Sequence, residues 1–183
     1  GSTGFVYRQS PTRNKKINRI SLQRWRTAWT GLHTNQNQTV RILFDMTEVY
    51  TDASFQPELK LSTFAYLIRQ DNKTVVKRSG YLGVYNSVHI AETLAVKRAL
   101  LDIVTMKIIE INFYMDNLGV IKKLGGTRTI GKSTKKYLRQ QQNLIKEKLA
   151  YIPHHFYHVK GHGDNKFHNW CDYQARQELR AIL

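Results

Sequence analysis

From residue 45 onward, apolar stretches rich in β-branched and aromatic residues are separated by short polar turns. The first three stretches are "TEVYTDASF" at 47–55, "LSTFAYLIRQ" at 61–70 and "VVKRSGYLG" at 75–83. Because the turns between them are short, this pattern predicts an antiparallel meander of three strands. Two further strands are expected: "IIEINFYMD" at 108–116, where apolar and polar positions alternate, and "HHFYHVKG" at 154–161.

The segments between and after these strands are expected to be helical. The expected helices lie at 87–104, with Ser87 as the N-terminal cap, and at 117–124, 136–150 and 169–183. Strand–helix–strand units favour parallel pairing with right-handed crossovers. The sequence therefore predicts an α/β fold with a mixed five-stranded sheet, three antiparallel strands followed by parallel ones, and helices on both faces.

Composition changes near residue 44. Residues 1–44 contain no Asp or Glu, whereas 45–183 carry all the acidic residues. We therefore expect a basic N-terminal extension at 1–44, with "GSTG" at 1–4 as the remnant of an expression tag, and one folded domain at 45–183. The extension is interpreted either as a nucleic-acid grip, in which Arg side chains lie beside Trp, or as a cationic tail whose Trp residues pack on the domain. An Arg-rich, acid-free start is also typical of organelle-targeting segments.

The net charge narrows the class of partner. Lys and Arg number 29 against 13 Asp and Glu, which gives a formal charge of +16. A chain with this charge is expected to bind a negatively charged polymer, and nucleic acid is the commonest such partner. No apolar run approaches the roughly 18 residues that a membrane-spanning helix needs, so we expect no membrane association. The single Cys171 excludes an internal disulfide and indicates an intracellular, reducing compartment, the cytoplasm or nucleus, with an organelle as the alternative.

Four acidic residues occupy positions that are informative as a set. Asp52 is expected to end the first strand and Asp116 the strand at 108–116, while Glu92 lies on the apolar stripe of a helix and Asp172 opens the last helix. Taken singly, Asp52 is explained as a turn residue and the other two Asp as helix caps. Together, in this topology, they predict crowded carboxylates neutralised by a hard divalent cation such as Mg²⁺ or Mn²⁺.

Four segments carry a resemblance to a known family. "YTDAS", "HIAETLAV", "INFYMDN" and "HVKGHGDNKFHNWCD" together resemble the type 1 ribonuclease H family, over roughly residues 45 to 180. The resemblance implies that Asp52, Glu92, Asp116 and Asp172 bind metal. It also implies that His162, in a Gly-flanked loop, is the family's mobile catalytic histidine.

The resemblance further implies an endonuclease that hydrolyses the RNA strand of RNA–DNA hybrids and leaves 5′-phosphate and 3′-hydroxyl ends. Two Mg²⁺ ions, for which Mn²⁺ can substitute, would lie about 4 Å apart. Asp52 would bridge both ions, and Glu92 would lie close to the 2′-hydroxyl of the strand being cut. His162 would assist proton transfer at the leaving group and product release.

Binding of the hybrid is expected to be largely independent of its sequence. The candidate contact residues are basic or aromatic: Arg24, Trp25, Arg26, Arg128, Lys132, Lys135, Lys136 and Lys160. Besides the hybrid, a polymerase or reverse transcriptase domain in the same polyprotein is an expected partner. The domain itself is expected to be monomeric.

Two departures from the family pattern stand out. The family usually has Asn four residues before the last acid, where this chain has His168, and no Trp lies between Asp116 and His162. His168 is interpreted as a packing residue, as are the histidines at 154, 155 and 158, and Cys171 is expected to be buried and inert.

Two other functions remain as alternatives to hybrid cleavage. One is a DNA nuclease or strand-transferase on the same fold, and the other is a non-catalytic scaffold that only binds nucleic acid. The complete acid set and the loop histidine favour hybrid cleavage.

Overall fold

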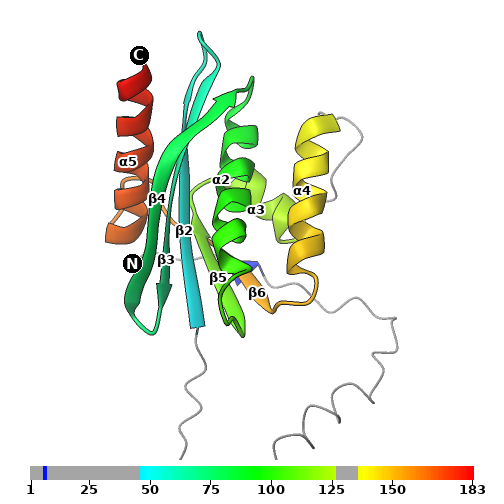
Figure 1. The fold of residues 1–183 in the computed structure, drawn as a ribbon. Helices are drawn as coiled ribbons and strands as arrows, with labels where there is room; N and C mark the ends of the chain where they lie inside the picture. The colour runs from blue at the N-terminus through cyan, green and yellow to red at the C-terminus, as the bar shows by residue number, and fades with distance from the viewer. Residues whose placement is uncertain (1–5, 8–45, 127–135) are drawn as a thin grey trace, which may run out of the picture. The chain divides into compact units, whose positions relative to one another are not determined.

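The computed structural model describes residues 6–7, 46–126 and 136–183. Its strands are β1 (Val6–Tyr7), β2 (Met46–Gln56), β3 (Leu61–Gln70), β4 (Lys73–Val84), β5 (Glu110–Met115) and β6 (His154–His158). They form one six-stranded sheet in the order β1-β6-β5-β2-β3-β4 (Figure 1). Five of these strands confirm the predicted mixed sheet. The two-residue strand β1 was not predicted, and it pairs antiparallel with β6 at one edge.

The meander β2-β3-β4 is antiparallel throughout, as the short turns predict. Strand β2 continues past Asp52 to Gln56, so the prediction that Asp52 ends this strand is wrong. The reason is that β3 supplies a pairing partner for every residue of this segment, including Ala65 opposite Asp52. Strand β4 has no further neighbour among the described strands, and two register shifts interrupt its pairing with β3.

Strands β2, β5 and β6 run parallel to one another. The ladder between β2 and β5 ends at the pair Tyr50 and Tyr114. Asp52 therefore lies two residues after the last residue of β2 in this ladder, and Asp116 lies two residues after the last residue of β5 in it. Carboxyl ends of parallel strands are where sites form in open α/β sheets, so this end of the sheet is the natural place to look for chemistry.

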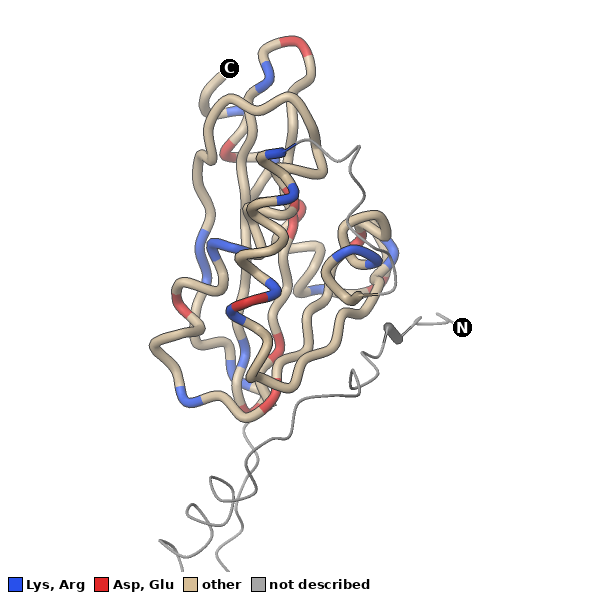
Figure 2. The backbone as a smooth tube through the Cα atoms, turned by 90° about the vertical axis from the view of Figure 1, so that its right-hand side faces the viewer, with Lys and Arg blue, Asp and Glu red and all other residues tan. Residues whose placement is uncertain are grey.

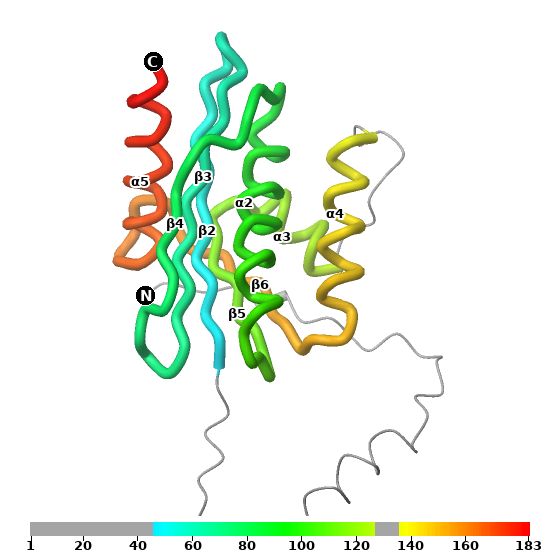
Figure 3. The backbone as a smooth tube through the Cα atoms, viewed as in Figure 1, coloured from blue at the N-terminus to red at the C-terminus, as the bar shows by residue number. Residues whose placement is uncertain are grey.

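Helices cover both faces of the sheet, as predicted. They are α2 (Val88–Ile103), α3 (Leu118–Leu124), α4 (Lys136–Leu149) and α5 (Lys166–Ile182). Helix α5 lies on one face, and α2, α3 and α4 lie on the other (Figures 1 and 3). The larger core cluster lies under α2, α3 and α4 and includes Phe113 and Phe156, whose rings stack. A smaller cluster under α5 contains Tyr50, Leu67 and Cys171.

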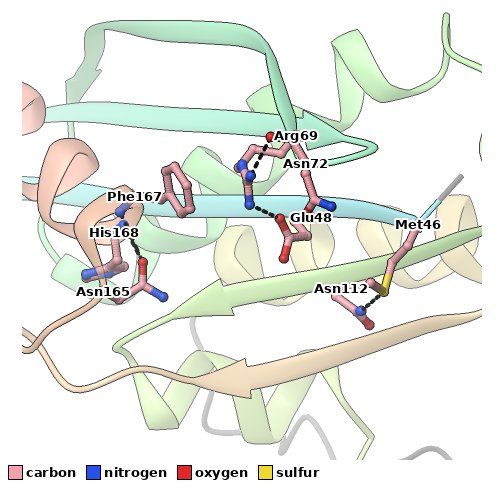
Figure 4. Close-up of polar contacts among 8 residues, drawn as sticks. All are labelled: Met46, Glu48, Arg69, Asn72, Asn112, Asn165, Phe167 and His168. Carbon is pink, nitrogen blue, oxygen red and sulfur yellow. Dashed lines mark hydrogen bonds and ion pairs between the residues drawn. The ribbon is translucent and has the colours of Figure 1, made fainter.

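Helix α5 begins at Lys166, three residues before the predicted start at Asn169. The side chain of Asn165 caps it by accepting hydrogen bonds from the backbone N–H groups of Phe167 and His168, at 3.1 and 3.0 Å (Figure 4). Asp172 therefore lies in the second turn and does not open the helix. Because Asn117 similarly caps α3, neither Asp116 nor Asp172 is needed as a cap.

Charged residues of both signs are spread along the described chain (Figure 2). None of the described helices is long and apolar enough to cross a membrane. The predicted boundary at residue 44 and the tag remnant at 1–4 lie outside the described residues.

Candidate active site

Asp52 and Asp116 meet at the carboxyl end of the parallel strands. Asp52 is buried on β2, and Asp116 follows β5 directly and is half-buried. One carboxylate oxygen from each, together with a ring nitrogen of His168, all lie within 4.8 Å of one another. This spacing is small enough for a single cation to contact all three groups after minor adjustment.

Glu92 joins this group from the second turn of α2, which packs on β2 and β3. Its side chain is only 3% exposed, and it shares a hydrogen bond with Asp52. Burial raises the pKa of Glu92 well above its ordinary value, and the nearby charges of Asp52 and Asp116 raise it further. Its Oε2 atom has no hydrogen-bond partner, so the carboxyl group has unused capacity to bind a ligand.

The same crowding affects Asp52. Burial, followed by the charges of Asp116 and Asp172, raises the pKa of Asp52 to about 8, although the N–H of Ala53 and the carboxyl of Glu92 oppose this shift. Without a compensating cation, the buried carboxyl is therefore protonated near neutral pH. A cluster that resists ionisation in this way favours a divalent cation, which would neutralise it.

Asp172 lies on the solvent side of the cluster. Its Oδ2 atom is 3.3 Å from Nδ1 of His162, and it also accepts a hydrogen bond from Arg176 one turn later in α5. The His162 side chain is 72% exposed, whereas that of Asp172 is 19% exposed. The structure thus brings all four predicted acids into one electrostatic group, with the predicted loop histidine at its rim.

A side chain at either glycine beside His162 would be crowded. A Cβ atom on Gly161 would lie 2.9 Å from Oδ2 of Asp116, and one on Gly163 would lie 2.9 Å from the carbonyl oxygen of Lys160. His162 itself has a left-handed backbone with φ of 55°. The loop is therefore packed tightly against Asp116 while its imidazole remains in solvent.

His168 has a more specific position than its interpretation as a packing residue suggests. It is 1% exposed in the first turn of α5, and it faces Asp52 and Asp116. Neither of its ring nitrogens has a hydrogen-bond partner. Burial lowers the pKa of His168, against the opposing charges of Asp116 and Asp172. The sequence signal for this residue was the departure from Asn at its position.

Two of the predicted nucleic-acid contacts, Lys136 and Lys160, fall among the described residues. Arg24, Trp25, Arg26, Arg128, Lys132 and Lys135 lie outside the described residues. Lys160 and Lys136 are exposed, and Lys160 directly precedes Gly161, where an added Cβ atom would lie 2.9 Å from Oδ2 of Asp116. Cys171 is buried, as expected, and burial raises the pKa of its thiol well above the ordinary value.

The histidines at 154, 155 and 158 lie on β6, as expected for strand residues. The ring of His158 also lies 3.1 Å from the backbone oxygen of Asp116, and so supports the segment that carries this acid.

Comparisons with known proteins are consistent with this geometry. Residues 50–161, more than half of the chain, match a family described as reverse transcriptase-like. No curated protein sequence matches. Ribonuclease H1 from the halophilic archaeon Halobacterium salinarum is similar in structure, with a TM-score of 0.63, 17% identity, and coverage of 74% of this chain and 98% of that chain.

Two further solved structures are similar. A ribonuclease H1 isolated from compost, in complex with an RNA/DNA hybrid, gives a TM-score of 0.59 at 17% identity, covering 73% of this chain and 99% of that one. The N-terminal ribonuclease H domain of a Mycobacterium tuberculosis protein gives a TM-score of 0.59 at 11% identity, covering 76% and 99%. At these identities the similarity establishes the fold.

Proposed function

The chain belongs to the reverse transcriptase-like family and has the ribonuclease H fold, and from this premise we propose that it is an endonuclease that hydrolyses the RNA strand of RNA–DNA hybrids. The observation that carries the proposal is the buried pair Asp52 and Glu92 beside Asp116, with Asp172 and His162 at the solvent rim. A scaffold that only bound nucleic acid would have no use for carboxyl groups buried at such electrostatic cost.

The donor set fits divalent cations. Asp52, Glu92, Asp116 and Asp172 offer hard oxygen ligands, and one oxygen of Glu92 lacks a partner. We propose two Mg²⁺ ions, for which Mn²⁺ can substitute, with Asp52 as the carboxylate shared between them. Bound there, the ions would activate a water for in-line attack and stabilise the leaving 3′ oxygen, which leaves 5′-phosphate and 3′-hydroxyl ends.

The protein's own groups have separate roles in this proposal. Glu92 lies on α2 and would be close to the 2′-hydroxyl of the RNA, which distinguishes RNA from DNA. His162 would hold and transfer a proton at the leaving oxygen, because its ring is exposed at the rim of the acid cluster and imidazole is a common general acid and base. Asp172 would orient this ring through the contact between its Oδ2 atom and Nδ1 of His162.

Substrate binding is proposed to be electrostatic. Lys160 is exposed beside the site and would contact a phosphate of the hybrid, and Lys136 at the start of α4 would contact the flanking backbone. The remaining basic residues predicted from the sequence would act with them, including those of the extension at 1–44. A polymerase or reverse transcriptase domain in the same polyprotein is the proposed protein partner, in an intracellular compartment.

A cleavage assay tests the proposal directly. A labelled RNA–DNA hybrid, an RNA duplex and a DNA duplex are incubated with the protein and Mg²⁺, and the ends of the products are analysed. We expect cleavage of the RNA strand of the hybrid alone. Asp116→Asn should abolish cleavage and preserve hybrid binding, whereas Asp164→Asn, which changes an exposed acid in the loop before α5, should retain full activity.

Other outcomes identify the alternatives. Cleavage of the DNA duplex would indicate a DNA nuclease or strand-transferase. Tight hybrid binding without cleavage in Mg²⁺ or Mn²⁺ would indicate a scaffold and contradict the proposal.

A further inference from the structure

His168 is a buried imidazole without a partner in the structure. It is 1% exposed, and neither Nδ1 nor Nε2 makes a hydrogen bond. Burying a polar group without compensation destabilises a protein, so such groups are rare and usually have a ligand or a water as partner. The position of His168 is fixed at the backbone, because Asn165 accepts a hydrogen bond from its N–H (Figure 4).

The nearest candidate partner for the His168 ring is a cation bound by the acids. A ring nitrogen of His168 and carboxylate oxygens of Asp52 and Asp116 all lie within 4.8 Å of one another. Two atoms that bind one ion at about 2.1 Å are separated by at most about 4.2 Å. Small rotations of the two Asp side chains that move their oxygens by a few tenths of an ångström would therefore allow all three groups to bind one ion.

The chemistry of this ligand set differs from that of carboxylates alone. Mg²⁺ strongly prefers oxygen ligands, whereas imidazole nitrogen favours first-row transition ions. An Asn at this position, as the sequence resemblance leads one to expect, would offer an amide oxygen in place of the ring nitrogen. The substitution of His for Asn thus changes the donor atom at a buried position that faces the metal-binding acids.

We propose that His168 is a nitrogen ligand to one of the metal ions, which makes this site a mixed oxygen–nitrogen site with a raised preference for Mn²⁺ over Mg²⁺. The inference rests on the proposed function, since it assigns the ion that Asp52 and Asp116 would bind. It leaves the roles of the four carboxylates unchanged and adds a fifth protein ligand.

Electron paramagnetic resonance of bound Mn²⁺ tests this inference without measuring catalysis. Loss of the free-ion signal during titration gives the affinity, and electron spin-echo envelope modulation detects nitrogen bound to the ion. We expect a nitrogen coupling in the wild-type protein that changes when histidine is labelled with ¹⁵N. His168→Asn should abolish the coupling and weaken Mn²⁺ binding about tenfold or more, with a smaller effect on Mg²⁺ measured by competition.

Two further variants serve as controls. His154→Asn makes the same chemical change at the start of β6, where the ring contacts the backbone oxygen of Ile152, and should leave the coupling intact. His168→Gln retains a polar side chain and should also lose the coupling. Thermal unfolding of each variant shows whether the fold is retained.

The results separate this inference from the proposed function. Bound Mn²⁺ without nitrogen coupling, or a coupling that survives in His168→Asn, would overturn the inference even if the hybrid is cleaved normally. In that case His168 would act as a positioning residue for Asp116. Wild-type protein that binds neither Mn²⁺ nor Mg²⁺ and cleaves no hybrid would overturn the proposed function as well.

Discussion

Nδ1 of His162 lies 3.3 Å from Oδ2 of Asp172, and the histidine that makes this contact has a left-handed backbone with φ of 55°. A non-glycine residue in this region carries a conformational cost, and such residues concentrate at functional sites. Here Gly161 allows the loop to approach Asp116 closely, and Gly163 allows it to turn back onto the carbonyl oxygen of Lys160. The local conformation therefore places an exposed imidazole beside the acid cluster at the expense of some stability.

Variants at His162 should separate the ring from the backbone. His162→Ala and His162→Gly both remove the imidazole, so both should lower kcat for hybrid cleavage by about 10²-fold. Glycine adopts positive φ without steric cost, so His162→Gly should be more stable than His162→Ala by about 1 kcal/mol in denaturant unfolding. Equal stabilities would show that the backbone of this loop relaxes and that the left-handed conformation is not imposed.

Gly161→Ala should disturb the site through Asp116. The added Cβ would lie 2.9 Å from Oδ2 of Asp116, so this carboxylate or the loop must move. Because small displacements of catalytic groups are costly, we expect kcat/KM to fall by about 10²-fold. Gly80→Ala is a matched control, since its Cβ would lie 3.4 Å from the Phe64 ring, an ordinary contact. A Gly161→Ala enzyme with unchanged kinetics would contradict the close packing of this loop.

The pKa of Asp52 predicts a pH-dependent stability. It is raised from 3.8 to about 8, mainly by burial and then by the charges of Asp116 and Asp172. The folded protein therefore holds a proton that the unfolded chain releases, so this residue's contribution to stability is complete below about pH 4 and is lost as pH rises towards 8. Asp52→Asn cannot ionise, so at pH 8 without metal its free energy of unfolding should exceed that of the wild type by up to about 5 kcal/mol.

The free energies of unfolding of Asp52→Asn and the wild type are compared by urea unfolding at pH 5 and pH 8, in buffer that contains a metal chelator. The stability advantage of Asp52→Asn should be larger at pH 8 and should shrink when Mg²⁺ is added, because the ion stabilises only the ionised wild-type cluster. An advantage that is equal at both pH values would mean that Asp52 does not hold a proton in the folded state.

Arg69 connects the start of α5 to the sheet. Its guanidinium donates to Glu48 at 2.5 Å and lies 4.1 Å from the ring centre of Phe167 (Figure 4). Both charged side chains are largely buried, so removing one leaves the other without its partner. Arg69→Met should destabilise the protein by about 2 kcal/mol. In a double-mutant cycle with Glu48→Gln, the coupling energy should be about 1 kcal/mol or more. A coupling energy near zero would indicate that the ion pair between Arg69 and Glu48 contributes as little to stability as a solvent-exposed pair does.

Prediction from the sequence was accurate for the strands and helices that the apolar pattern defines. It was less accurate for the ends of elements that depend on tertiary contacts. The five main strands, and the antiparallel meander of the first three, followed from short turns and apolar stretches. The extension of β2 beyond Asp52 depends on its partner β3, which a pattern confined to one segment does not reveal. The early start of α5 depends on the cap at Asn165, a signal that lies within a segment resembling a loop.

The candidate site shows the same division. Asp52, Glu92, Asp116 and Asp172 could be proposed as a set, because the four segments that carry them together resemble one family, although each Asp alone has an ordinary explanation. His168 departs from the Asn expected at its position, but this departure alone does not indicate that the ring faces the acids. Only the fold shows that its ring is buried against two of the acids with both nitrogens unpartnered.

Strand β4 has a consequence for the behaviour of the protein in concentrated solution. It has 12 residues and pairs on one side only among the described strands, so it offers backbone groups to which another chain could add. Lys73, Lys77 and Arg78 are exposed along it, and the register shifts against β3 make it irregular. Two copies aligned along β4 would bring these cations together, which opposes strand addition. The exposed cations of β4 thus oppose the addition of a second copy at this sheet edge.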